Sequence, residues 1–215
     1  MLKLNTLYNL DCMIGMRDFP DKYFDLCICD PPYGINIDNS GRLVREKGFQ
    51  NKGWDNIIPS DSYFNELFRV SMNQIIWGGN YFNLSPCRGF IIWDKLQPNN
   101  VSFANYEFAW TSFNVSAKKY VKRHNSDNRI HPTQKPIALY KWLLQNYAKQ
   151  GDKILDTHAG SCSSVIACID GGFDWIAFEL DEDYYKAALQ RINNHVRQFD
   201  IFNENKSNNI QATIF

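Results

Sequence analysis

The tetrapeptide Asp30-Pro31-Pro32-Tyr33 is the segment of this chain whose residue types best suit chemistry. An apolar run from Phe24 to Cys29 precedes it and Gly34 follows, the pattern of a buried strand that ends in a sharp turn. Two prolines fix φ and donate no hydrogen bonds, so nearby carbonyl groups stay free as acceptors. A carboxylate, carbonyl oxygens and an aromatic ring held in this way suit a planar substrate with an exocyclic amine. The alternative is a turn without function.

A second segment has the pattern of a turn that binds an adenosyl group. A strand pattern ends in Asp156-Thr157-His158-Ala159-Gly160-Ser161 and a helix pattern follows, and the next strand pattern ends in Glu179-Leu180. A Rossmann-like half binds an adenosyl ligand in this order of elements, with the acid on the ribose hydroxyls. Cys162 stands where a dinucleotide fingerprint has its second glycine, which disfavours a dinucleotide and is compatible with S-adenosylmethionine, a ligand without phosphate groups. An ordinary tight turn is the alternative.

The composition of the 215 residues limits the other possibilities. Lys and Arg number 23, Asp and Glu number 23, and a formal net charge of zero argues mildly against binding nucleic acid by bulk electrostatics. No apolar run approaches the roughly 18 residues of a membrane span, and the N-terminus lacks the apolar core of a secretion signal. We therefore expect a cytoplasmic protein. The six cysteines form no Cys-x-x-Cys pair, so we expect free thiols and no metal site.

Two basic stretches are candidates for contact with phosphate groups, and a solvated face is the alternative for both. The first contains Arg42, Arg45, Lys47 and Lys52, and the second contains Lys118, Lys119, Lys122, Arg123 and Arg129.

Strand patterns alternate with helix patterns along the chain, which predicts a mostly parallel sheet covered on both faces. The residues from 199 onward are rich in asparagine, and we expect them to fray. The expected strands are residues 2–10, 24–29, 74–77, 90–93, 106–111, 153–155 and 175–180, and the expected helices are residues 12–19, 61–72, 136–148, 163–169 and 183–196.

The order of three motifs makes the chain resemble the β-class DNA amino-methyltransferases, in which the catalytic half precedes the cofactor half. The motifs are Asp30-Pro31-Pro32-Tyr33, then His131-Pro132-Thr133-Gln134-Lys135-Pro136, then Asp156 to Ser161 with Glu179. Three further segments resemble an adenine-specific subgroup often carried by phages and prophages. These are Trp77 to Phe82, Trp93-Asp94-Lys95 and Glu107 to Ser112.

The resemblance implies an α/β fold: a circularly permuted, Rossmann-like S-adenosylmethionine-dependent methyltransferase with a mostly parallel seven-stranded sheet and one antiparallel strand. One domain would cover residues 1–200, with a catalytic half at 1–113, a small recognition or linker segment at 114–130 and a cofactor half at 131–200. Residues 201–215 would form a tail. The resemblance also implies a role in DNA methylation and restriction-modification.

The resemblance further implies the roles of individual residues. Asp30, Pro31, Pro32 and Tyr33 would be catalytic, and no metal would take part. The expected residues for binding S-adenosylmethionine are Asp11, Cys12, Asp30, His131, Thr133, Gln134, Lys135, Asp156, Thr157, His158, Gly160, Ser161, Glu179 and Leu180. The residues expected to contact DNA are Arg42, Arg45, Lys47, Lys118, Lys119, Lys122 and Arg123.

The expected reaction is methylation of the N6 amine of an adenine flipped out of double-stranded DNA. Cytosine N4 is the nearest alternative, but family members that act there more often have serine at the position of Asp30. A protein or RNA amine, and an inactive prophage remnant that only binds DNA or cofactor, are the others. So little chain is left for recognition that we expect either a short DNA site or a homodimer.

Overall fold

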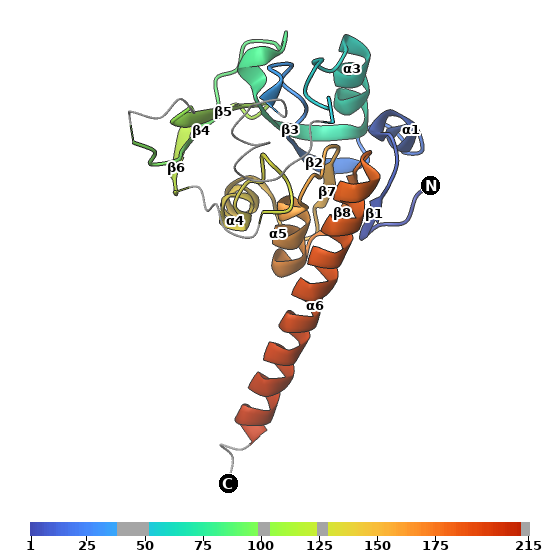
Figure 1. Cartoon of the computed structure of the whole chain (residues 1–215), viewed down its shortest axis with the longest axis vertical. Helices are drawn as coiled ribbons and strands as arrows, with labels where there is room; N and C mark the ends of the chain where they lie inside the picture. The colour runs from blue at the N-terminus through green and yellow to red at the C-terminus, as the bar shows by residue number, and fades with distance from the viewer. Residues whose placement is uncertain (38–51, 99–103, 124–128, 212–215) are drawn as a thin grey trace.

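The computed structural model describes residues 1–37, 52–98, 104–123 and 129–211, and in this part of the chain all strands lie in one sheet (Figure 1). The strands are β1 (Thr6–Tyr8), β2 (Phe24–Cys29), β3 (Ser71–Trp77), β4 (Phe90–Asp94), β5 (Tyr106–Thr111), β6 (Lys118–Val121), β7 (Lys153–Asp156) and β8 (Asp174–Phe178). Their order is β1-β8-β7-β2-β3-β5-β4-β6. β5 is antiparallel to its neighbours β3 and β4, and every other pairing is parallel.

The strand order confirms the permuted methyltransferase arrangement. β1 and β2 come first in the chain, yet β8 and β7 lie between them in the sheet. The expectation of a mostly parallel sheet with one antiparallel strand is also confirmed.

The expected number of seven strands is wrong, because the described part of the chain contains eight. The additional strand, β6, lies within residues 114–130, which were expected to be an irregular linker. It pairs only with β4, at the edge of the sheet. Its sequence, Lys-Lys-Tyr-Val, has no clear alternation of apolar residues, because an edge strand with exposed side chains has little to bury.

Helices cover both faces of the sheet, as expected. The helical elements are α1 (Cys12–Met16), α3 (Asp61–Val70), the 3-10 turn η2 (Gly79–Tyr81), α4 (Ile137–Tyr147), α5 (Ser163–Gly171) and α6 (Glu182–Gln211). Side chains of α4, α5 and α6 pack in one core with strand residues such as Ile28 and Trp77. Side chains of α1 and α3 pack in the other core, with residues such as Cys27 and Phe178.

The expectation that the chain frays from residue 199 is wrong as far as Gln211, because α6 continues to that residue. In Figure 1 this helix projects from the body of the protein toward the C-terminus. The segment is rich in asparagine, a weak helix former, but it contains neither glycine nor proline. The helix that starts on the sheet therefore meets no residue that would end it.

The sheet brings both motifs of the sequence to one edge. β8, β7 and β2 are parallel neighbours, so their carboxyl ends lie side by side. Asp30 directly follows β2, Asp156 ends β7, and Glu179 directly follows β8. Ligands bind outside the carboxyl ends of the strands in open sheets of this kind. Among the described residues, no helix is long and apolar enough to cross a membrane.

Candidate active site

The carboxylate of Asp30 is held by one side chain nearby in the sequence and by one from a distant part of the chain. The Tyr33 hydroxyl donates a hydrogen bond of 2.5 Å to Oδ1. The Lys135 ammonium donates to Oδ2 and forms an ion pair with it. Burial raises the pKa of Asp30, and the positive charge of Lys135 opposes that rise. The carboxylate is therefore fixed in orientation, with both oxygens engaged.

Lys135 extends this contact into a row of alternating charges. Its side chain is 3% exposed, and its Nζ lies 3.1 Å from Oε2 of Glu107 on β5. The Nζ of Lys95 lies 2.5 Å from Oε1 of the same glutamate. Burial favours the neutral form of Glu107, but Lys135 and Lys95 lower its pKa to about 2. Each charge in the row thus has an opposite charge beside it, which a buried site requires.

The ring of Tyr33 packs on residues that follow β3. Gly78 has a φ of +69°, and a Cβ there would lie 2.1 Å from Cε1 of Tyr33, so a side chain would displace the ring. Tyr81 of η2 stacks on Tyr33 with centroids 5.0 Å apart and an interplanar angle of 13°. Tyr81 is 43% exposed, so the pair presents an aromatic surface at the catalytic edge of the sheet.

Asp156 lies between the two candidate sites. The backbone N–H of His158 donates to its Oδ1 at 3.0 Å, and the Ser164 hydroxyl donates to Oδ2. Burial raises the pKa of Asp156 to about 7; these hydrogen bonds oppose the rise, and the charges of Asp30 and Glu179 add to it. Since β7 lies between β8 and β2, Asp156 lies between Glu179 and Asp30 at the same edge of the sheet.

The carboxylate of Glu179 is fixed by backbone groups. The N–H of Gly160 donates to Oε2 at 2.8 Å, and the N–H of Asp181 donates to Oε1 at 2.9 Å. Burial raises the pKa of Glu179, and these hydrogen bonds oppose the rise. A carboxylate has about four acceptor positions, so Glu179 can accept a further hydrogen bond from a ribose hydroxyl. An acceptor of this kind fits the adenosyl group of S-adenosylmethionine.

Cys162 occupies the left-handed region that glycine adopts most easily. Its φ is 58°, and it caps the N-terminus of α5, after Gly160 and Ser161 in the turn. A residue with a Cβ costs roughly 1–2 kcal/mol in this region. The thiol is fully buried, and burial raises its pKa well above the usual range. The cysteine therefore keeps the glycine conformation of the turn.

The segment around His131 lies against the cofactor turn. A Cβ on Gly160 would be 3.5 Å from the His131 ring. Burial lowers the pKa of His131 to about 3, so the ring is neutral, and its Nδ1 lies 3.1 Å from Oγ1 of Thr133. Oε1 of Gln134 accepts a hydrogen bond of 3.1 Å from the N–H of Ile130. Lys135, which is also expected to bind the cofactor, contacts Asp30 and Glu107.

Four other expected cofactor residues have structural contacts near this edge. Oγ1 of Thr157 lies 2.7 Å from the hydroxyl of Tyr63. Burial lowers the pKa of His158 to about 4. The Asp11 carboxylate caps α1 by accepting the N–H of Met13 at 2.7 Å. Burial raises the pKa of Cys12 to about 12, so this cysteine is a thiol.

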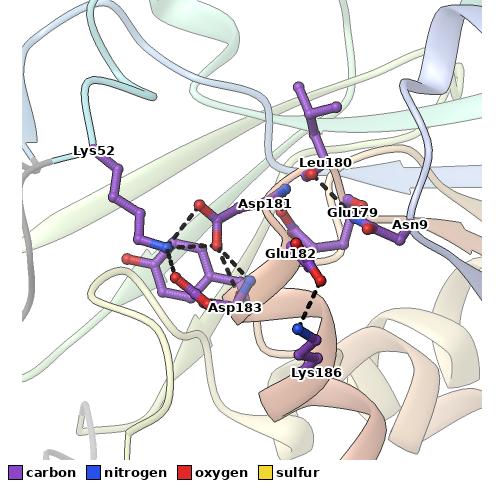
Figure 2. Close-up of polar contacts among 9 residues, drawn as sticks. Asn9, Lys52, Glu179, Leu180, Asp181, Glu182, Asp183 and Lys186 are labelled. Carbon is purple, nitrogen blue, oxygen red and sulfur yellow. Dashed lines mark hydrogen bonds and ion pairs between the residues drawn. The ribbon is translucent and has the colours of Figure 1, made fainter.

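A polar cluster lies just beyond Glu179 (Figure 2). The Lys52 ammonium donates hydrogen bonds of 2.7 Å to both oxygens of Asp181 and to Oδ2 of Asp183. The Asn9 amide donates to the carbonyl oxygens of Glu179 and Leu180 at 2.8 and 3.0 Å. Lys52 was grouped with basic residues for phosphate contact, but it is paired with acids of the cofactor half.

The basic residues expected to contact DNA fall into two groups. Arg42, Arg45 and Lys47 lie outside the described residues. The residues of the second group are exposed on or just after β6, but two of them have partners. Lys118 donates to Oδ1 of Asn146 at 2.7 Å, and Lys119 lies 3.5 Å from Oδ2 of Asp94. This group consists of Lys118, Lys119, Lys122 and Arg123.

Comparison with known proteins agrees with this geometry. The model of the DNA methylase family N6_N4_Mtase matches residues 93–190. The resemblance to the DNA amino-methyltransferases is confirmed. The matched family supports a DNA methyltransferase that uses S-adenosylmethionine.

Relatives support the same assignment. The Escherichia coli (strain K12) protein YubD, which is named a methylase, is 24% identical over 203 residues, covering 85% of this chain and 87% of YubD. The structure of the M1.HpyAVI–SAM complex has a TM-score of 0.59 at 18% identity and covers 87% of this chain and 98% of its own. The cytosine-N4-specific PvuII DNA methyltransferase has a TM-score of 0.62 at 13% identity, with coverages of 94% and 93%. The two structures show that the DNA methyltransferase fold is shared.

Sequence reasoning missed three charged side chains at this site. Glu107 and Lys95 were seen only as parts of family motifs, although they complete the charge row at Asp30. Asp55 was passed over in a weakly patterned stretch, yet it is 1% exposed and bonds to the backbone of the catalytic turn. Its one signal in the sequence is an acid directly after a tryptophan, which by itself is not specific.

Proposed function

We propose that this chain transfers the methyl group of S-adenosylmethionine to the N6 amine of adenine in double-stranded DNA. The observation that carries the proposal is the half-buried Asp30 carboxylate, held by Tyr33 and Lys135 at the end of β2, one strand away from Asp156. An acid in this place can accept hydrogen bonds from an exocyclic amine while the methyl donor lies over the neighbouring strands.

The cofactor half of the site would hold S-adenosylmethionine, which supplies an electrophilic methyl group. Glu179 would accept hydrogen bonds from the ribose hydroxyls, and Asp11 would contact the adenine of the ligand. The turn through Gly160 and Ser161 would let the ligand approach the backbone. The remaining contacts would come from Cys12, Asp30, His131, Thr133, Gln134, Lys135, Asp156, Thr157, His158 and Leu180.

The target adenine must leave the duplex before it can reach Asp30, which costs a few kcal/mol. Stacking on Tyr33 would recover part of that cost, since base–aromatic stacking is worth roughly 1–3 kcal/mol. Asp30 and the Pro31 carbonyl would accept the two amino hydrogens, and Pro32 keeps this turn stiff. The nitrogen lone pair is then drawn out of conjugation and aimed at the methyl group, and the carboxylate stabilises positive charge that develops on nitrogen.

Lys135 gives Asp30 a way to accept the amine. Each Asp30 oxygen already accepts one hydrogen bond, so the amine would either use a remaining acceptor position or displace Lys135. Lys135 is also 3.1 Å from Glu107, so its charge keeps a partner when it releases Oδ2. The row of charges can therefore adjust without leaving a buried ion alone.

The identity of residue 30 favours adenine over cytosine. The resemblance associates serine at this position with cytosine N4, and this chain has aspartate. Cytosine N4 remains the second candidate, because the PvuII enzyme, whose fold this chain shares, is cytosine-N4-specific.

Contacts with DNA phosphates would come from basic residues at the edge of the sheet. Lys119, Lys122 and Arg123 are exposed on or after β6, while Lys118 is bonded to Asn146. The other contacts proposed are those of Arg42, Arg45 and Lys47. Recognition of a site of more than a few base pairs would use a second copy of the chain as a homodimer.

Methyl-labelled S-adenosylmethionine tests the proposal. The protein is incubated with mixed-sequence DNA, the DNA is digested to nucleosides, and the label is located by chromatography. We expect it in N6-methyldeoxyadenosine. Label in N4-methyldeoxycytidine would replace the proposal with its second candidate. No label, with normal binding of S-adenosylmethionine by calorimetry, would identify an inactive remnant. Sequencing that detects modified bases would then give the DNA site.

A further inference from the structure

The carboxylate of Asp55 is buried against the backbone of the catalytic turn. Its Oδ1 accepts hydrogen bonds from the N–H groups of Tyr33 at 2.6 Å and Gly34 at 3.0 Å. Its Oδ2 accepts the N–H of Ile37 at 2.9 Å. The backbone carbonyl of Asp55 also accepts the N–H of Asn36 at 3.1 Å. With 1% exposure, this side chain is committed to the turn rather than to water.

The turn needs such a partner because of its sequence. Pro31 and Pro32 have no N–H groups, so the two residues after Asp30 cannot donate backbone hydrogen bonds. Gly34 and Asn36 then have φ values of +70° and 56°, a path that no regular element supports. A carboxylate that gathers three N–H groups gives this path charge-assisted hydrogen bonds. It therefore sets where Tyr33 lies beside Asp30.

The segment that carries Asp55 is itself fixed to the cofactor half. Lys52 is paired with Asp181 and Asp183, as Figure 2 shows. The Trp54 ring lies 5.3 Å from the ring of His131. The segment from Lys52 to Asp55 thus joins the turn after β8 to the turn after β2.

We propose that Asp55 is a positioning residue for methyl transfer, which acts by holding the backbone of residues 33–37 so that Tyr33 and Asp30 keep their relative geometry. Lys52 holds the same segment against the cofactor half. Asp55 itself contacts neither substrate. The inference rests on the proposed function, since it assigns the Asp55 carboxylate to the same reaction.

A purely structural role for Asp55 is the competing explanation, and Asp25 provides a matched control. The Asp25 carboxylate also accepts a backbone N–H, that of Lys153 at 2.8 Å. It lies at the start of β2, at the opposite end of the strand from Asp30. Replacing Asp25 removes a carboxylate–backbone hydrogen bond at the far end of β2, the strand that Asp30 follows. It leaves the backbone contacts of residues 33–37 unchanged.

The test compares Asp55→Ala, Asp55→Asn and Asp25→Ala in the full chain, with kcat expressed per folded molecule from circular dichroism. We expect Asp55→Ala to lower kcat about 100-fold, the effect of a displacement near 1 Å. Asp55→Asn keeps one acceptor oxygen and should lose about tenfold, as for one hydrogen bond to a charged group. Asp25→Ala should keep wild-type kcat. The dissociation constant of S-adenosylmethionine should change less than about threefold in all three variants.

Hydrogen exchange gives a second readout that needs no catalysis. The amides of Tyr33, Gly34 and Ile37 should exchange faster in both Asp55 variants and at the wild-type rate in Asp25→Ala. Unchanged exchange in Asp55→Asn, or equal losses of kcat in Asp55→Ala and Asp25→Ala, would overturn the inference. Absence of methyl transfer by the wild-type chain would overturn the proposed function instead, while the exchange rates would still show whether Asp55 organises the turn.

Discussion

The catalytic and cofactor sides of this site are built from different interactions. Asp30 is held by two side chains, the Tyr33 hydroxyl and the Lys135 ammonium. Glu179 is held by two backbone N–H groups of neighbouring turns. A side-chain partner can move aside when the amine of a substrate arrives, whereas a backbone partner stays in place. We therefore expect the hydrogen bonds of Asp30 to rearrange during the reaction and those of Glu179 to be in place before the cofactor binds.

Replacing Asp30 and Glu179 in turn is the strongest test of this difference between the two sides of the site. Asp30→Ala should lower kcat at least about 1,000-fold, because it removes both the amine acceptor and the negative charge. The affinity for S-adenosylmethionine should stay within about threefold. Glu179→Ala should instead weaken that affinity by at least about tenfold, since two hydrogen bonds to a charged group are lost. Single-turnover kinetics and calorimetry measure the two effects. Near-normal turnover by Asp30→Ala would contradict the scheme.

Loss of the cation tests how strongly the catalytic side depends on charge. Lys135→Met leaves Asp30 without its ion pair and should reduce the free energy of unfolding by about 3–5 kcal/mol. Asp30→Asn in the same chain should recover part of that stability but no activity. Urea unfolding of the single and double variants measures this. If the double variant is no more stable than Lys135→Met, burial of an unpaired charge is not the cause.

Two substitutions of Tyr33 separate its ring from its hydroxyl. Tyr33→Phe removes the hydrogen bond to Oδ1 of Asp30 but keeps the ring, and should retain appreciable activity. Tyr33→Ala should lose roughly 1–3 kcal/mol of base stacking, or about 5- to 150-fold in kcat/KM. Steady-state kinetics on one DNA substrate compares them. Equal losses would mean that the hydroxyl, and not stacking, is what counts.

The pH dependence of stability should show a smaller effect on the cofactor side. The pKa of Asp156 rises from 3.8 to about 7 on folding, so its stabilising contribution is full below pH 3.8 and is lost as the pH rises through 7. His131 acts in the opposite direction: its pKa falls from 6.5 to about 3, and its contribution is lost as the pH falls below 6.5. Relative to wild type, Asp156→Asn should therefore be more stable at pH 8 than at pH 5. Thermal unfolding at both values measures the difference, and an equal difference at both would contradict the shift.

The motifs of the site could be predicted from the sequence because each is local. Asp30 to Tyr33 and Asp156 to Ser161 follow short apolar runs, so a strand and a turn were expected at both. The partners of Asp30 could not be assigned in this way. Lys135 and Glu107 are far from Asp30 in the chain, and only the pairing of β2, β3 and β5 determines which charges meet. Asp55 was missed for the same reason, since its importance lies in the N–H groups it collects.

The sequence alone determined most of the order of strands and helices and the acids at the strand ends, because apolar periodicity and turn residues act over a few neighbours. The permuted fold class came from the order of the motifs that resemble the DNA amino-methyltransferases. The tertiary structure decided the rest. It added β6 at an edge where burial leaves no pattern, continued α6 to Gln211, and placed Lys135 beside Asp30. Contacts of this kind depend on packing between distant segments, and a buried charge takes whichever opposite charge the fold brings within reach.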